Sequence, residues 1–242
     1  MMKPVTKIAV FTVHKAGSML LHRITLEACA LAQLKYYSPN NKELSDSLLY
    51  FQDFKVNCCQ SALAEFNYID TGCIGPIRRP LEIDLDSCFV NLHLRDPRDG
   101  LNSMFFSWTK THGGIKKSIR DEWLSWGIDK FVISFSDDYF ERYEKYLNHF
   151  IGHPGVNLLK YEDMVDNFDS WFTSFVQPFQ LSSEDINGLS KQLSDQVDPK
   201  NAKPNTHIRK ITPGDFRNNL KPETIDTLNQ KFGHILSALD YL

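Results

Sequence analysis

The chain has 242 residues, and its 27 lysines and arginines against 30 aspartates and glutamates give a formal net charge of −3. This balance argues against a protein that coats nucleic acid or an anionic membrane through its overall charge, so we expect no nucleic-acid partner. Hydrophobic residues make up 42% and aromatic residues 12% of the chain, which is too apolar for a disordered protein. The length suits one large α/β domain or two small ones, and because the sequence shows no internal repeat and no clear linker, we expect a single domain across residues 1–242.

The five cysteines form no CxxC pair and no Cys/His cluster, so we expect no metal site. Residues 1–7 lead almost directly into a strand-like run and lack the layout of a signal peptide. No apolar stretch approaches the roughly 18 residues of a membrane span. These features together predict a protein with reduced thiols in the cytoplasm and no membrane span.

The chain opens with the apolar, β-branched run KIAVFTV, residues 7–13, which predicts a buried parallel strand. A polar turn with one glycine follows, and leucines and isoleucines at helical spacing begin at Ser18. For residues 35–60 we expect a loop and a short helix. Further strands are predicted at 66–69, 88–94 and 156–160. Helices are predicted at 97–109, 136–150, 161–176, 182–197 and 222–242, with a long loop at 198–218.

Strands that alternate with helices form right-handed crossovers and a parallel sheet. The predicted fold is therefore α/β with three layers. A central parallel sheet of about four to five strands has helices on both faces, as in P-loop nucleotide-binding folds. Ligands of such sheets bind at the carboxyl ends of the strands, and three positively charged segments are expected there.

The first segment is FTVHKAGSML, in which a strand ends, the chain turns and a helix begins. Backbone N–H groups at a helix start and the positive end of the helix dipole favour an anion. Lys15 adds a full charge, Ser18 a hydroxyl, and Gly17 lets the backbone approach a ligand closely. The Walker pattern GxxxxGK[ST] is absent, because Lys15 precedes the glycine. The alternative is a plain turn with a surface lysine.

The second segment is LHLRDPRDGLNSMFF, which places Arg95 at the end of a buried strand and Ser103 about two turns into the following helix. Both side chains can reach one anion at the strand end. Asp96 is a predicted helix N-cap. The alternative is that Arg95 pairs with Asp96 or Asp99 and only ties strand to helix, and we expect Arg98 and Asp99 to be solvated or locally paired.

The third segment is HIRKITPGDFRNNL, where Arg209, Lys210 and Arg217 gather positive charge in a loop without periodicity. Loops of this length are more often functional or disordered than structural. The alternative is an exposed, flexible basic loop.

Together with KYEDM, residues 160–164, these segments resemble the sulfotransferases that use 3′-phosphoadenosine 5′-phosphosulfate (PAPS). FTVHKAGSML is similar to the family's 5′-phosphosulfate loop, LRDPRDGLNSMFF to its 3′-phosphate motif, and RKITPGDF to its C-terminal RKG…GDW segment. Two departures are Ile211 in place of a glycine and Phe216 in place of a tryptophan.

The resemblance implies in-line transfer of the sulfonate from PAPS to a hydroxyl or amine of a small-molecule acceptor, releasing adenosine 3′,5′-bisphosphate. It implies that Lys15 also stabilises charge on the leaving group. The implied 5′-phosphosulfate ligands are Lys15, Ala16, Gly17, Ser18 and Met19. The implied 3′-phosphate ligands are Arg95, Ser103, Arg209 and Lys210.

The family's cytosolic members carry a histidine just after the strand that precedes the arginine motif, and this histidine takes the acceptor's proton. This chain has Gly72 at about that point. We hypothesise that Asp70, at the end of the predicted strand 66–69, is the base, with His14 and His112 as further candidates.

The acceptor is barely constrained by the sequence. If the family layout holds, residues 112–114 with Trp108, Trp123 and Trp126 would form a mobile aromatic lid that suits an apolar acceptor. Packing against the core is the alternative for each tryptophan. Two other functions stay open: a sulfotransferase-like module that binds nucleotide without turnover, favoured by the missing histidine, and a P-loop small-molecule kinase, disfavoured by the missing Walker pattern.

Overall fold

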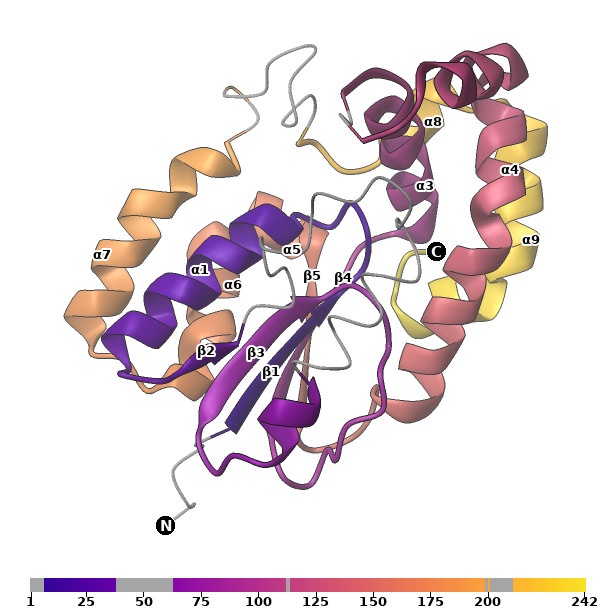
Figure 1. Ribbon diagram of the computed structural model, residues 1–242. Coiled ribbons are helices and arrows are strands. Elements are labelled where there is room, and N and C mark those ends of the chain that lie inside the picture. Colours follow the sequence, from indigo (N-terminus) through magenta and orange to yellow (C-terminus); the bar gives the residue numbers. More distant parts are fainter. Residues whose placement is uncertain (1–6, 38–62, 112–113, 199, 201–210) are drawn as a thin grey trace.

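A computed structural model describes residues 7–37, 63–111, 114–198, 200 and 211–242 (Figure 1). These residues contain one five-stranded sheet with the strand order β2-β3-β1-β4-β5, in which every neighbouring pair is parallel. The parallel sheet confirms the predicted fold class. The strands are β1 (Lys7–Thr12), β2 (Tyr36–Tyr37), β3 (Gly72–Ile77), β4 (Phe89–Leu94) and β5 (Val156–Lys160).

The central strand β1 is buried along its whole length, as its run of apolar residues predicts. Its side chains alternate between the two faces, so Ile8 and Val10 join one apolar cluster while Ala9 and Phe11 join the other. Phe11 lies opposite Ile77 on one neighbour and Leu92 on the other. The carboxyl ends of β1, β3 and β4 therefore meet at one edge of the sheet.

Helices cover both faces of the sheet (Figure 1). One face carries α1 (Ser18–Leu31), α5 (Tyr161–Asp166), α6 (Phe168–Val176) and α7 (Ser183–Leu193). The other carries α3 (Pro97–Phe106), α4 (Lys117–His149), α8 (Phe216–Asn219) and α9 (Pro222–Ala238). No helix within the described ranges is both long and apolar enough to cross a membrane.

The strand predicted second along the chain lies later than expected and is β3. Residues 63–67 are helical, and the strand is Gly72–Ile77, so the prediction of a strand at 66–69 was wrong. Glycine and proline are poor strand formers, so the segment GCIGPI was not recognised as a strand from the sequence. The sheet nevertheless needs Gly75, because a Cβ there would lie 2.4 Å from the carbonyl oxygen of Val10.

Several helix boundaries also differ from the predictions. The helix predicted at 136–150 is the second half of α4, which begins at Lys117 and is kinked at Gly127. The helix predicted at 161–176 is two helices, because Asn167 leaves helical geometry and its side chain caps α6. The helix after β4 continues beyond α3 as a π-helical segment, Ser107–Thr111. The short strand β2 was not predicted, and within the predicted loop 198–218 the last residues begin α8.

Candidate functional site

The turn between β1 and α1, residues 13–17, is the centre of the site, and we call it the Lys15 loop. Lys15 has a backbone φ of 68° and Gly17 one of 72°, so both lie in the left-handed region. A left-handed lysine is uncommon and marks a backbone held by its surroundings. A Cβ at Gly17 would be tight, because it would lie 3.2 Å from the terminal methyl group of Met164, while its 3.6 Å distance to Tyr161 is an ordinary contact. The loop therefore packs closely against α5.

Side chains from distant elements hold the carbonyl groups of this turn. Arg95 donates from Nη1 to the Lys15 carbonyl at 2.7 Å, and Tyr139 donates from its hydroxyl to the His14 carbonyl at 2.6 Å. Tyr146 donates in the same way to the carbonyl of Thr12 at 3.0 Å. The first N–H groups of α1 lack partners within their own helix and lie at the positive end of its dipole. This arrangement presents donors and positive charge to an anion at the carboxyl edge of the sheet.

Arg95 is buried directly after β4, with an exposed fraction of 4%. Its guanidinium lies 4.1 Å from the ring centre of Tyr161 and 3.5 Å from a carboxylate oxygen of Asp99. Burial lowers the pKa of Arg95, but Tyr161, Asp99 and Glu162 outweigh this effect and leave the pKa raised. Arg95 thus ties strand to helix through Asp99, as the alternative reading foresaw, and it also touches the Lys15 loop.

Asp99 fastens the C-terminal segment to this site, a role that the sequence did not reveal. Of the two options expected for Asp99, the structure shows local pairing, with Arg95, and not solvation, because Asp99 is fully buried. Its carboxylate accepts from the backbone N–H groups of Gly214 at 2.5 Å and Phe216 at 3.0 Å. The Tyr161 hydroxyl donates to the carbonyl of Ile211 at 3.0 Å. Residues 211–216 are therefore held beside Arg95 and α5.

Arg209, Lys210 and His112 lie outside the described residues, so their predicted roles stay predictions. Residues 211–216 directly follow Arg209 and Lys210 in the chain and are anchored at Asp99 and Tyr161.

Arg98 is also buried, so solvation, one of the two options expected for it, does not apply. It pairs locally with Asp96 at 2.7 Å, as the other option foresaw. Its Nη1 donates to Asn229 Oδ1 at 2.6 Å, and Nη2, which also bonds Asp96, donates to the Tyr241 carbonyl at 2.8 Å. Arg98 therefore fixes α9 and the C-terminus to the start of α3. None of these bonds reaches the Lys15 loop.

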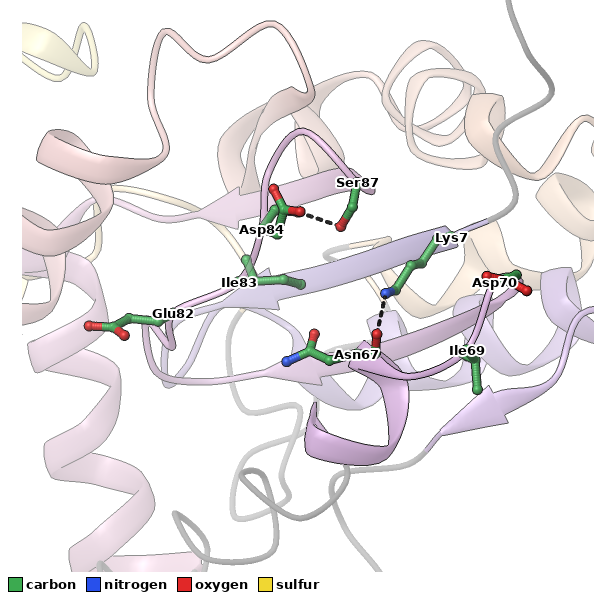
Figure 2. A pocket seen from close by; sticks show the side chains of 8 residues that line it. All are labelled: Lys7, Asn67, Ile69, Asp70, Glu82, Ile83, Asp84 and Ser87. Carbon is green, nitrogen blue, oxygen red and sulfur yellow. Dashed lines mark hydrogen bonds between the residues drawn. The ribbon is translucent and has the colours of Figure 1, made fainter.

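The structure corrects the position of Asp70. Because β3 begins at Gly72, opposite Lys7 at the start of β1, Asp70 lies at the amino edge of the sheet. There it is exposed and lines an open pocket of about 540 Å³ together with Lys7 and Asn67 (Figure 2). Lys15 follows the other end of β1, a six-residue strand about 20 Å long. The hypothesis that Asp70 is the base was wrong, because it rested on the misplaced strand.

His14 is part of the Lys15 loop, and Trp108 contacts it from the segment that follows α3. Trp108 donates from Nε1 to His14 Nε2 at 3.2 Å, so the lone pair of that nitrogen is already engaged. Trp108 stacks on Trp123 with ring centres 5.3 Å apart, and the edges of Phe131 and Phe135 complete the cluster. Phe131 is fully buried and the other three rings are half-buried; all four pack in the core cluster and form an apolar wall next to His14.

The remaining predicted ligands occupy different positions at the same edge. Ala16 is buried, Ser18 starts α1, and the Met19 side chain is 71% exposed on the first turn. Ser103 is half-buried on α3, two turns from its start. A direct hydrogen bond to the Lys15 carbonyl thus joins Arg95 to the segment Lys15–Met19. Among the described residues, Ser103 forms no hydrogen bond with that segment or with Arg95.

The chain matches no model of a protein family and no curated protein by sequence, so the comparison rests on solved structures. Mouse sulfotransferase SULT7A1 complexed with PAP has a similar structure, with a TM-score of 0.63 at 16% identity over 96% of this chain and 84% of that one. Retinol dehydratase in complex with androsterone and inactive cofactor PAP gives 0.60 at 17% identity over 98% and 82%. The same enzyme with retinol and PAP gives 0.60 at 16% identity, with the same coverage.

These similarities define the class of fold: the chain has the fold of the PAPS-dependent sulfotransferases. At 16–17% identity they establish the fold alone. Within the part of the chain that the structure describes, no group of three His, Cys, Asp or Glu side chains is placed to hold a metal ion.

Proposed function

We propose that this protein is a sulfotransferase that moves the sulfonate group of PAPS to a hydroxyl or amine of a small-molecule acceptor in the cytoplasm. The observation that carries the proposal is the Lys15 loop. Its left-handed backbone is held by Arg95 and Tyr139 and faces the carboxyl edge of the sheet. The comparison structures, which contain PAP or PAP with a small molecule, support this choice of nucleotide.

The roles follow from charge and position. The N–H groups at the start of α1 and the Lys15 ammonium would hold the 5′-phosphosulfate, with Ala16, Gly17, Ser18 and Met19 supplying backbone and the serine hydroxyl. Arg95, Ser103, Arg209 and Lys210 would hold the 3′-phosphate. Lys15 would stabilise the negative charge that develops on the leaving oxygen as the acceptor attacks in line. Positioning and fixed positive charge account for catalysis of such a loose transition state.

Nucleotide selectivity tests this proposal. Adenosine 3′,5′-bisphosphate at a hundred times its Kd is expected to stabilise the protein by about 2.7 kcal/mol. For a chain of this size that raises Tm by about 5–10 °C. Magnesium-ATP, which a P-loop kinase would bind, is expected to give no shift. A shift with magnesium-ATP and none with the bisphosphate, measured by differential scanning fluorimetry, would contradict the proposal.

A non-catalytic nucleotide-binding module remains the second candidate, and the position of Asp70 at the far edge of the sheet favours it. Such a module would show the thermal shift without forming a sulfonated product. The two candidate functions therefore differ in whether the protein has a general base that can take the acceptor's proton.

A further inference from the structure

A histidine on α1 is held in one defined tautomer by its neighbours. His22 lies one turn after Ser18, on the same side of the helix and about 6 Å along its axis. Tyr36, on β2, donates its hydroxyl hydrogen to the carbonyl of Gly75 at 2.5 Å. With its only hydrogen used, the Tyr36 oxygen must accept at its 2.7 Å contact with Nδ1 of His22. Nδ1 of His22 therefore carries the hydrogen, and the lone pair resides on Nε2.

The surroundings keep this imidazole neutral. Burial lowers the pKa of His22, and the positive charge of Arg78 lowers it further. The groups that face the imidazole are thus Tyr36 from β2 and Arg78, which directly follows the carboxyl end of β3. Nε2 makes no hydrogen bond with any described residue and the side chain is only half-buried, so a base with an available lone pair is present at neutral pH.

Position distinguishes His22 from the other histidines near this edge. His14 uses Nε2 to accept from Trp108. His93 is fully buried in β4, and burial lowers its pKa to about 3, so no acceptor can reach it. α1 begins at the Lys15 loop, so His22 lies one helical turn from that loop, and its partner Tyr36 bonds to the carbonyl of Gly75 in the second half of β3.

We propose that His22 is the general base of the transfer reaction and that Tyr36 is its positioning residue. This inference rests on the proposed function. The acceptor oxygen forms a bond to the sulfur of PAPS while the bond from sulfur to the bridging oxygen breaks, and that electron pair leaves with adenosine 3′,5′-bisphosphate. The acceptor proton passes to Nε2 of His22 and later to solvent. A base oriented by a second group through its other ring nitrogen is a recurrent device of nucleophilic catalysis.

Two phenols of similar size and different acidity test the role of His22. In the presence of PAPS and at a pH above neutral, 4-methylphenol must lose its proton during attack, whereas the more acidic 4-nitrophenol is already largely ionised. We expect His22→Ala to lower kcat about 100-fold or more on 4-methylphenol and less than about tenfold on 4-nitrophenol. Added imidazole should restore part of the lost rate on 4-methylphenol. The thermal shift with adenosine 3′,5′-bisphosphate should equal that of the wild type.

Two further variants complete the experiment. Tyr36→Phe removes the acceptor for Nδ1, so we expect the same selective loss on 4-methylphenol, smaller than for His22→Ala, with the KM for PAPS unchanged. A defect in folding would lower both rates equally. His149→Ala, which changes an exposed histidine at the end of α4, serves as the matched control and should leave both rates unchanged.

The outcomes distinguish a failure of the proposed role of His22 from a failure of the proposed function. Equal losses on the two phenols in His22→Ala, or no loss on either, would overturn the role of His22 while transfer by the wild type upheld the proposed function. Transfer by the wild type to neither phenol, despite a thermal shift with the bisphosphate, would overturn the role of His22 toward hydroxyl acceptors. The absence of any shift with the bisphosphate would overturn the proposed function, and the inference with it.

Discussion

Lys15→Ala is expected to lower the kcat of sulfonate transfer by about 10³-fold, because it removes the lysine proposed to stabilise charge on the leaving oxygen. Loss of a single preorganised donor of this kind typically costs 10²–10³ in kcat. Alanine keeps the Cβ, so the left-handed backbone at φ 68° should cost no more than in the wild type. The melting temperature is therefore expected to change little, and steady-state kinetics with PAPS measures the effect.

The matched control for this variant is Lys117→Ala, which removes a lysine whose side chain is 88% exposed on α4. It should leave kcat unchanged, because an exposed ion pair contributes little. Transfer by Lys15→Ala at the wild-type rate would refute the role of this loop in catalysis.

Arg95→Ala is expected to weaken the binding of adenosine 3′,5′-bisphosphate by about 100-fold or more. The variant loses a buried cation and the 2.7 Å bond that holds the Lys15 carbonyl. It also leaves the carboxylate of Asp99 buried without this partner, so a loss of about 3–5 kcal/mol of stability is expected as well. Isothermal titration below the lowered melting temperature measures the affinity.

Lysine variants separate binding from folding. Arg95→Lys keeps the charge but not the planar guanidinium that reaches two partners, and about a tenfold loss of affinity is expected. Arg98→Lys, at an equally buried position bonded to Asp96 and Asn229, should lower stability and leave nucleotide affinity unchanged. An unchanged affinity in both Arg95 variants would contradict the assigned site.

The sequence allowed the central strand and the Lys15 loop to be predicted, because both depend on local cues. A run of buried β-branched residues, a turn with Gly17 and a helix from Ser18 all lie within one short segment. The helix after Arg95 was predicted for the same reason: Asp96 caps it, as the structure shows with its bond to the N–H of Arg98 at 2.9 Å.

The features that could not be predicted depend on contacts between distant segments. Nothing near Gly75 in the sequence shows that Val10 leaves it no room for a side chain. The strand was therefore misplaced, and Asp70 was assigned to the wrong edge of the sheet. The bonds from Asp99 to Gly214 and Phe216 span more than a hundred residues, so no local pattern could disclose them. His22 was overlooked because the partner that orients it, Tyr36, lies on a two-residue strand.

One measurement tests the central claim most directly: incubation of the wild-type protein with PAPS and a panel of phenols, alcohols and amines, followed by mass spectrometry of nucleotide and acceptor. We predict a sulfonated acceptor and adenosine 3′,5′-bisphosphate in equal amounts, both abolished in Lys15→Ala. Binding of the bisphosphate without a sulfonated product from any acceptor would contradict the assignment as an enzyme and identify a nucleotide-binding module instead.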